Sequence, residues 1–242
     1  MTRTLLRKTS ATLLQVAALL VPRRCTICGR RLEAGEHCVC AACTLTLPYT
    51  RYSHLRNNPV EMLFIGRFPL GRAGAYLLYS SGAATPQLLY TLKYRHGTRI
   101  GREFGRRMAV EMLEYGFFEG IDAIVPVPLS PRRERLRGYN QSLMIALGIS
   151  SVTGIDVDCE ILKRTIDNPT QTRLSRHERM ANVNGIFAIC HPERIAGRHL
   201  LLVDDMVTTG ATLTACADTL TAAGAARISI VSLAASVNIG AW

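Results

Sequence analysis

The sequence is poor in several residue types, and each scarcity narrows the class of protein. Only 6% of the 242 residues are aromatic, and only 18 acidic side chains stand against 29 Lys and Arg, which gives a net charge of +11. Only three of the basic residues are Lys, so Arg carries most of this charge. No apolar run reaches the roughly 18 residues that a membrane-spanning helix needs, so no membrane span is expected. Hydrophobic residues make up 48% of the chain, which is enough for a folded core and excludes an intrinsically disordered protein.

The positive charge is the first indication of function. A surplus of Arg favours an anionic partner, either a nucleic acid or a phosphate compound. An ordinary solvated surface explains the same surplus, so charge alone leaves these interpretations open. The length indicates one large domain, or one domain with a small additional module.

Residues 1–22 begin in the manner of a secretory signal, with Arg3, Arg7 and Lys8 ahead of an apolar stretch. Pro22 and two Arg follow that stretch, and no small-residue cleavage site is present. The apolar side chains recur every three to four residues, which predicts an amphipathic packing helix over 1–22 in preference to an export signal. We therefore expect a cytoplasmic protein.

Five of the eight Cys residues lie close together near the N-terminus. Cys25 and Cys28 form one Cys-x-x-Cys pair, and Cys40 and Cys43 form a second pair after eleven intervening residues. Two such pairs supply four thiolates for one tetrahedral Zn²⁺, and four Cys ligands leave no open position, so the predicted zinc is structural. Two disulfides are the alternative, which needs an oxidising compartment. Cys38 stays open as a replacement for Cys40, although Cys40 gives two equal pairs.

We assign residues 23–48 to the zinc-binding module. The chain that follows is first irregular and then periodic in its apolar residues. Residues 49–84 contain several Pro and Gly and predict a linker or a small irregular subdomain, with one candidate strand at 75–79. Residues 85–242 predict one α/β domain, because apolar strands alternate with helical patterns. A parallel sheet covered by helices is expected, with helices over 85–115 (broken at Gly97), 139–153 and 212–223, and strands at 121–127, 161–162, 185–189, 199–203 and 228–233.

The most informative motif lies between Leu200 and Leu213. A buried strand is predicted to end in Asp204 and Asp205, and a turn of small and hydroxyl residues then opens a helix. Parallel sheets bind ligands at this end of their strands. The two carboxylates can accept hydrogen bonds from two hydroxyls of a ribose, and the backbone N–H groups at the helix start suit a phosphate, with Gly210 allowing close approach. The predicted phosphate site consists of Thr208, Thr209, Gly210, Ala211 and Thr212, so the combined site fits a ribose 5-phosphate.

Two other interpretations compete for this motif. A P-loop ATPase also has an apolar strand that ends in acidic residues, but the chain has no Gly-Lys dipeptide, so the phosphate-binding loop of that fold is missing. A solvated strand-to-helix turn is the other alternative. Two adjacent Asp after four apolar residues, followed by Thr-Thr-Gly, argue against it.

The segment 200–213 resembles the phosphoribosyl pyrophosphate (PRPP) motif of type I phosphoribosyltransferases, and its surroundings resemble the ComF family, the competence protein F and GntX-like group. Five pieces match in order: the Cys25–Cys43 pairs, Tyr79-x-x-Gly82 with Leu92-Lys93-Tyr94-Arg95, Val125-Pro-Val-Pro128 with Arg137-Gly-Tyr-Asn-Gln141, Asn168-Pro-Thr-Gln171 with Arg179-x-x-Asn182, and Asp204–Thr212. The resemblance spans nearly the whole chain. It implies a type I phosphoribosyltransferase fold preceded by the four-cysteine zinc module, with Mg²⁺ accompanying PRPP.

The resemblance also implies roles for residues outside the PRPP motif. In the family a loop after the first sheet strand binds pyrophosphate, and here it contains Arg132, Arg133, Arg135 and Arg137, although a solvated basic loop is the alternative. A flexible flap covers the site in related enzymes, and its candidates here are Gln171, Arg173, Arg176 and Arg179. Lys93 and Arg95 are candidates for a hood or a partner surface. The candidate catalytic residues are Asp204, Asp205 and Arg137.

One residue departs from the pattern of purine-salvage members, which often carry an Asp general base where this chain has Thr208. Transfer to a purine base is therefore less favoured than transfer to a nitrogen that needs little deprotonation.

Two functions from different classes follow. The first is transfer of phosphoribose from PRPP to a nitrogen acceptor with release of pyrophosphate. The second, which the ComF resemblance implies, is an accessory role in DNA uptake during natural transformation, with single-stranded DNA and a competence helicase as partners and the nucleotide pocket kept as a sensor. Stacking aromatics for the second role are Tyr90, Tyr94 and Tyr139. Whether the chain is an enzyme stays open on the sequence.

Overall fold

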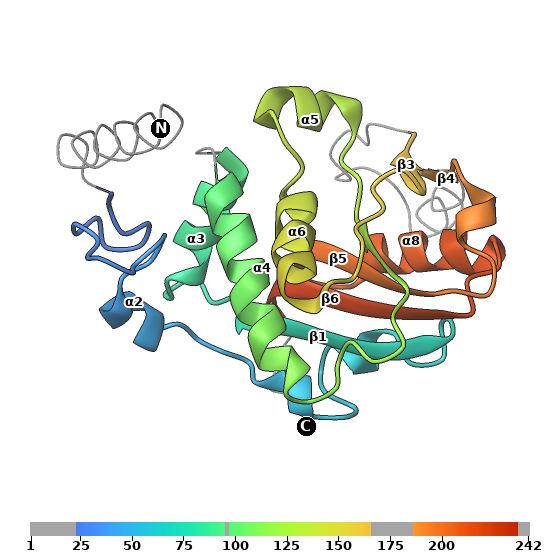
Figure 1. Cartoon of the computed structure of the whole chain (residues 1–242), viewed down its shortest axis with the longest axis horizontal. Coiled ribbons are helices and arrows are strands. Elements are labelled where there is room, and N and C mark those ends of the chain that lie inside the picture. The colour runs from blue at the N-terminus through green and yellow to red at the C-terminus, as the bar shows by residue number, and fades with distance from the viewer. Residues whose placement is uncertain (1–22, 95–96, 166–185, 237–242) are drawn as a thin grey trace, which may run out of the picture. The chain divides into compact units, whose positions relative to one another are not determined.

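The computed structural model describes residues 23–94, 97–165 and 186–236. The chain divides into two compact units, with the boundary between Leu47 and Pro48 (Figure 1). In the described ranges, no helix combines the length and the apolar character needed to cross a membrane. The predicted helix over 1–22 and the predicted flap residues lie outside these ranges, the latter being Gln171, Arg173, Arg176 and Arg179.

The first unit has a small core beside its cysteines. In its described part, residues 23–47, the helix α2 (Ala41–Leu45) follows an irregular segment in which Arg24 and Arg31 form an isolated β-bridge. Leu32, Val39 and Leu47 are buried. So few buried apolar side chains give little folding free energy, and small units of this kind usually depend on a metal or a disulfide.

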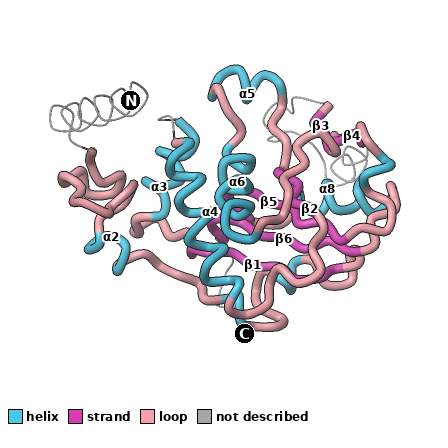
Figure 2. Tube along the Cα trace, viewed as in Figure 1, coloured by secondary structure: helices cyan, strands magenta, loops and turns pink. Residues whose placement is uncertain are grey.

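A parallel four-stranded sheet forms the centre of the second unit. Its strands follow the spatial order β1 (Leu70–Leu78), β6 (Arg227–Ala235), β5 (His199–Val207) and β2 (Ala123–Pro126), as Figure 2 shows. All three pairings are parallel. The apolar run 200–203 of β5 is fully buried, as in a central strand that is covered on both faces. The predicted α/β class with a parallel sheet is confirmed.

Helices cover both faces of this sheet. The helices α4 (Thr98–Leu113) and α6 (Gln141–Thr153) pack against each other in front of the sheet (Figure 1). Gly105 and Gly148 permit this contact, because a Cβ at either position would lie 2.2 Å from a backbone oxygen of the other helix. The helix α8 (Ala211–Ala222) packs on β5 and β6. A right-handed β5–α8–β6 connection runs opposite to the β1–α4–β2 connection, which places α8 on the other face.

The other described elements lie around this centre. They are α3 (Thr85–Tyr94), α5 (Pro131–Arg137), the 3-10 turns η1 (Tyr52–His54), η2 (Glu61–Leu63) and η3 (Pro192–Arg194), and the strands β3 (Leu162–Arg164) and β4 (Phe187–Ile189). The prediction that Gly97 separates two helices is confirmed, since Gly97 is the N-cap of α4.

The segment 49–84 differs most from its prediction as a linker or small subdomain. Its strand β1 pairs with β6 in the main sheet, and Val60 and Phe64 belong to the main hydrophobic core. The second unit therefore begins at Pro48 and not at residue 85. The candidate strand predicted at 75–79 is the second half of β1. The first half was not predicted, because the buried Arg72, whose Nε lies 3.1 Å from a carboxylate oxygen of Glu61, interrupts the apolar pattern there.

The strands β3 and β4 were expected within the parallel sheet, and this is corrected. They pair antiparallel in a separate two-stranded sheet, with Leu162 opposite Ile189. Each has three residues, which is too short for sequence periodicity to show which sheet it joins.

Candidate functional site

The acidic pair lies inside β5 and not beyond its end. Asp204 is in register with Ser232 of β6, and the pairing continues to Val207 and Ala235. The strand therefore runs further than predicted, past Asp205 to Val207, because β6 is long enough to pair with β5 as far as Val207 and Ala235. This extension brings Asp204 and Asp205 to the C-terminal edge of the sheet, where parallel sheets bind ligands.

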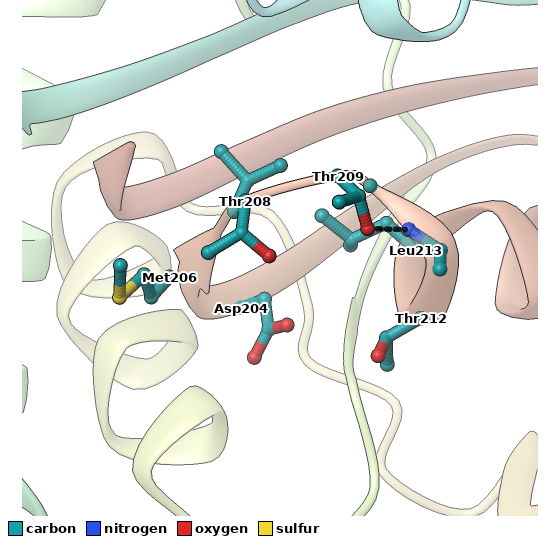
Figure 3. A pocket seen from close by; sticks show the side chains of 9 residues that line it. Asp204, Met206, Thr208, Thr209, Thr212 and Leu213 are labelled. Atoms are coloured by element: carbon teal, nitrogen blue, oxygen red, sulfur yellow. Dashed lines mark hydrogen bonds between the residues drawn. The ribbon is translucent and has the colours of Figure 1, made fainter. Parts of the chain in front are cut away.

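A pocket of about 200 Å³ lies between this strand end and the start of α8. Asp204 and the continuous segment 206–213 line it. Figure 3 shows side-chain oxygens from the strand, the turn and the first helical turn around the same hollow. Asp205 is not part of the lining, whereas every residue of the predicted phosphate site is, namely Thr208, Thr209, Gly210, Ala211 and Thr212.

The start of α8 presents hydrogen-bond donors to this pocket. The first N–H groups of a helix have no partner inside the helix and carry the positive end of its dipole. The Thr209 hydroxyl accepts from the backbone N–H of Ala211 at 3.5 Å, the dashed line in Figure 3. The neighbouring Thr208 and Thr212 hydroxyls add further donors. This arrangement can bind a tetrahedral oxyanion such as a phosphate monoester.

Gly210 is required by the turn and by packing. It is the N-cap of α8 with φ of +76°, a conformation that favours glycine. A Cβ at this position would lie 2.7 Å from Cε1 of the Phe64 ring. The sequence predicts close approach of a ligand at this glycine. The structure adds the Phe64 ring, which leaves no room for a Cβ there.

The carboxyl group of Asp204 is held by two hydrogen bonds. The Ser142 hydroxyl donates to Oδ1 at 3.1 Å, and the backbone N–H of Asp205 donates to the same oxygen at 2.8 Å. Removal from solvent and the neighbouring Asp205 carboxylate nevertheless raise the pKa of Asp204 to about 7, against the lowering effect of these hydrogen bonds and of Lys93. The group therefore changes charge near neutral pH.

Lys93 lies beside the acidic pair, a position that no pattern in the sequence predicts. Its Nζ lies 3.1 Å from Oδ2 of Asp205, and both side chains are largely buried. The sequence predicted a hood or partner surface for Lys93. Its rarity in an Arg-rich chain was the available signal, but no local pattern connects it with Asp205.

The predicted pyrophosphate loop is a short helix, which corrects that expectation. Ser130 caps the first turn of α5, Pro131 occupies its first position, and Gly138 ends it with φ of +76°. These start and stop signals are present in the sequence. Arg132, Arg133 and Arg135 are exposed on α5, and none of them lines the pocket.

Arg137 is held more firmly than the other arginines of α5. Its Nη1 donates to Oε1 of Gln141 at 2.9 Å, and its guanidinium lies 5.4 Å from the centroid of the Tyr94 ring. Gln141 is buried, and its Nε2 has no hydrogen-bond partner among the described residues. Arg137 itself does not line the pocket.

Four cysteines form the second candidate site. The sulfurs of Cys25, Cys28, Cys40 and Cys43 all lie within 4.8 Å of one another. Cys38 is not part of this cluster, so the structure favours Cys40, as predicted from the equal pairs. The first unit thus has one compact set of four ligands that can hold a metal ion.

The thiols of this cluster ionise very unequally. Burial opposes ionisation of Cys25, but backbone N–H groups, including that of Cys40 at 3.4 Å, outweigh it and lower its pKa to about 6. Burial, followed by the neighbouring thiols, raises the pKa of Cys43 to about 12. Four thiolates at these separations therefore need a cation between them, which is the chemistry of a tetrahedral thiolate metal site.

Comparison with known proteins agrees with this architecture. The family profile described as "Phosphoribosyl transferase domain" matches residues 145–238. The DNA utilization protein YhgH of Escherichia coli strain K12 is 30% identical over 227 residues, which cover 88% of this chain and 96% of that protein. Competence protein F of Haemophilus influenzae is 34% identical over 114 residues, covering 47% of this chain and 50% of that protein. Among solved structures, the glutamine PRPP amidotransferase from B. subtilis matches 59% of this chain and 30% of its own, with 18% identity and a TM-score of 0.40.

The sheet, the pocket and the matched domain define a protein of the phosphoribosyltransferase fold. Within that class, the chain belongs to the ComF family, which includes competence protein F and DNA utilization protein YhgH.

Proposed function

We propose that this chain binds PRPP, or another ligand that carries a ribose 5-phosphate, in the pocket at the end of β5. One observation carries the proposal: a single pocket joins the Asp204 carboxylate to the donor-rich start of α8. The two halves match the two ends of the ligand. A phosphate monoester suits the start of α8, and a vicinal diol suits carboxylate acceptors.

The residues divide between these two ends. The N–H groups at 211–213 and the hydroxyls of Thr208, Thr209 and Thr212 bind the 5-phosphate, while Asp204 and Asp205 accept hydrogen bonds from the ribose hydroxyls. Mg²⁺, bound together with PRPP, supplies countercharge for the pyrophosphate group. The side chains proposed to bind that group are Arg132, Arg133, Arg135 and Arg137.

Transfer of phosphoribose is the reaction that this ligand permits. The bond from ribose C1 to pyrophosphate breaks, a bond from C1 to the acceptor nitrogen forms, and the acceptor loses a proton. Thr208 is not a base, so an acceptor nitrogen that releases its proton easily fits this chain best. Fixed cations stabilise the charge that develops on the leaving pyrophosphate.

The names of the relatives point to the process in which this pocket works. DNA utilization protein YhgH and competence protein F are named for the use or uptake of DNA. We place this chain in DNA uptake, in the cytoplasm, with a competence helicase as its expected partner. The four cysteines hold a structural Zn²⁺ in this proposal, because four thiolates leave no position for a reacting ligand.

Calorimetric titration of Mg²⁺–PRPP into the purified chain tests the pocket. The wild type is expected to bind, and Asp204→Asn with Asp205→Asn is expected to weaken binding by about 100-fold, because charge-assisted hydrogen bonds to both hydroxyls are lost. Asp218→Asn is the matched control, since it removes a carboxylate further along α8 and outside the pocket lining. Equal affinity of the double variant and the control would contradict the proposal. An acceptor screen by pyrophosphate release then decides whether the chain is an enzyme.

A second candidate function, single-stranded DNA binding without catalysis, is favoured by one surface. The exposed rings of Tyr90 and Tyr94 lie with centroids 5.2 Å apart, and Arg137 contacts the Tyr94 ring. Exposed arginines of α5 precede Arg137 along the same helix. Bases stack on exposed aromatic rings, and arginines contact the phosphates. The Tyr139 ring is less exposed than those of Tyr90 and Tyr94, and its hydroxyl bonds the backbone at Leu92 and Gly97.

Anisotropy of a labelled oligothymidine in a salt series tests this surface. Tyr94→Ala is expected to weaken binding by about 5- to 100-fold, the range for loss of one stacked base, without changing the slope against salt. Arg132→Gln is expected to reduce that slope by about 0.7, because one phosphate contact is lost. Tyr115→Ala is the control, since Tyr115 is 47% exposed at the other end of α4. Equal affinities of Tyr94→Ala and Tyr115→Ala for the oligothymidine would contradict this function.

A further inference from the structure

We propose that Lys93 is the positioning residue for the sugar end of this pocket, because it holds the Asp205 carboxylate and ties it to the segment that carries Arg137. This inference rests on the proposed binding of a ribose 5-phosphate ligand and deepens it. Lys93 acts through Asp205 and not on the ligand.

Lys93 and Asp205 form a largely buried ion pair. The Lys93 Nζ lies 3.1 Å from Oδ2 of Asp205, with 25% of the Lys93 side chain and 13% of the Asp205 side chain exposed. At this degree of burial, solvent competes weakly, and a charge-assisted hydrogen bond keeps the carboxylate in one orientation. A ribose hydroxyl that approaches Asp205 thus meets a pre-oriented acceptor.

The Tyr139 hydroxyl holds the end of α3 in place. The Tyr139 hydroxyl donates to the backbone oxygen of Leu92 and accepts from the backbone N–H of Gly97 at 2.7 Å. These bonds fasten the residues on both sides of Lys93 to the connection between α5 and α6. The Lys93 backbone is therefore anchored, and its side chain spans a defined distance to β5.

Consecutive residues of α3 contact two different parts of the site. Lys93 binds Asp205, and the next residue, Tyr94, lies under the Arg137 guanidinium at 5.4 Å from the ring centroid. Arg137 belongs to the segment proposed to act on pyrophosphate. The last turn of α3 thereby connects the sugar end of the site with the pyrophosphate end.

Lys93 also affects Asp204, the other carboxyl group of the pair. The groups that act on Asp204 are the Asp205 carboxylate and backbone N–H, the Ser142 hydroxyl and the Lys93 ammonium, and Asp204 in turn raises the pKa of the buried Cys216 thiol. Lys93 lowers the pKa of Asp204, whereas burial and Asp205 raise it. Removal of the ammonium leaves two adjacent carboxylates without their nearest cation, so Asp204 then needs a higher pH to ionise.

The test compares Lys93→Met, Lys93→Arg, Asp205→Asn and the double variant Lys93→Met/Asp205→Asn, with affinities for Mg²⁺–PRPP and for ribose 5-phosphate measured by calorimetry. Lys93→Met is expected to weaken both ligands about tenfold, because both share the sugar end, and Lys93→Arg is expected to stay within about threefold of wild type. At a pH well above 7, where Asp204 is ionised, Lys93→Met in the Asp205→Asn background should change affinity less than about twofold, because its remaining effect passes through Asp205. A tenfold loss in that background would show direct contact with the ligand and overturn the positioning role.

A pH profile separates positioning from simple destabilisation. Affinity should rise with pH through about 7 in the wild type as Asp204 ionises, and Lys93→Met should move this midpoint upward. Titration of the ligand phosphate is common to both proteins and cancels in the difference. An unchanged midpoint in Lys93→Met would overturn the inference. This comparison remains possible if Asp205→Asn binds too weakly for its affinity to be measured. If Lys93→Met does not fold, Lys93→Gln replaces it with the same expectations.

Failure of this inference is distinguishable from failure of the proposed function. If the wild type binds neither ligand, the proposed function falls and this inference falls with it. If the wild type binds and Lys93→Met binds equally well, the inference alone is overturned.

Discussion

Removal of the proposed zinc by a chelator, or the substitution Cys43→Ser, is expected to unfold residues 23–47 and to leave the second unit folded. A structural zinc contributes on the order of 10 kcal/mol to the folding of small zinc modules. The described first unit has few buried apolar side chains to replace that contribution. The two units are separately compact, so the sheet and its core do not depend on the cysteine cluster.

Limited trypsin digestion with mass spectrometry measures this result, because residues 23–47 contain four Arg at which trypsin can cut, namely Arg23, Arg24, Arg30 and Arg31. The intact chain should bind roughly one zinc and resist cleavage there, and the chelated chain should be cut there first. Cys38→Ser is the matched control, because Cys38 is buried in the same unit and lies outside the four-cysteine cluster. Zinc retained by Cys43→Ser, or lost by Cys38→Ser, would contradict the proposed ligand set.

Gly210→Ala is expected to lower the stability of the second unit by about 2–5 kcal/mol, because it combines left-handed backbone strain with overpacking. The backbone at Gly210 has φ of +76°, and a Cβ there meets the Phe64 ring at 2.7 Å. For a unit of this size the loss corresponds to a fall in Tm of roughly 5–15 °C. Movement of the turn also displaces the start of α8, so Mg²⁺–PRPP binding should weaken by about tenfold or more.

Gly154→Ala provides the matched control for Gly210→Ala. Gly154 has φ of +73°, and no atom lies within 4 Å of an added Cβ. Its Ala variant should therefore show the backbone strain alone, about 1–2 kcal/mol, and leave ligand binding unchanged. Phe64→Leu should recover part of the Gly210→Ala loss, although it is destabilising by itself. Equal losses for the two Ala variants would show that contact with Phe64 has no part in the effect.

Several features of the site could be predicted because their causes are local in the chain. The sequence predicts one site from Asp204 and the segment 208–212, because a strand, a turn and a helix start follow one another directly, and all of these residues line one pocket in the structure. The spacing of Cys25, Cys28, Cys40 and Cys43 predicts one ligand set, and the structure brings those same sulfurs together. In both cases a short segment can adopt only a few conformations, so residue type and spacing are sufficient information.

Other features could not be predicted, because they depend on residues that are distant in the chain. The segment 49–84 looks irregular in sequence, yet β1 joins the main sheet, since its place depends on the edge that β6 offers. The α5 helix is a different case, because its Ser-Pro start and Gly stop are local signals that predict a short helix, whereas the family resemblance implies a loop.

The sequence by itself therefore determined the type of fold, the pocket segment and the cysteine ligands, since each rests on periodicity, turn chemistry or spacing within a short stretch. Only the tertiary structure decided that Lys93 pairs with Asp205 and that Phe64 packs against Gly210. Those contacts join α3 to β5, and the η2 turn to the start of α8, across large separations in the chain. Their geometry comes from the packing of whole elements around the sheet, and no local pattern of residues encodes it.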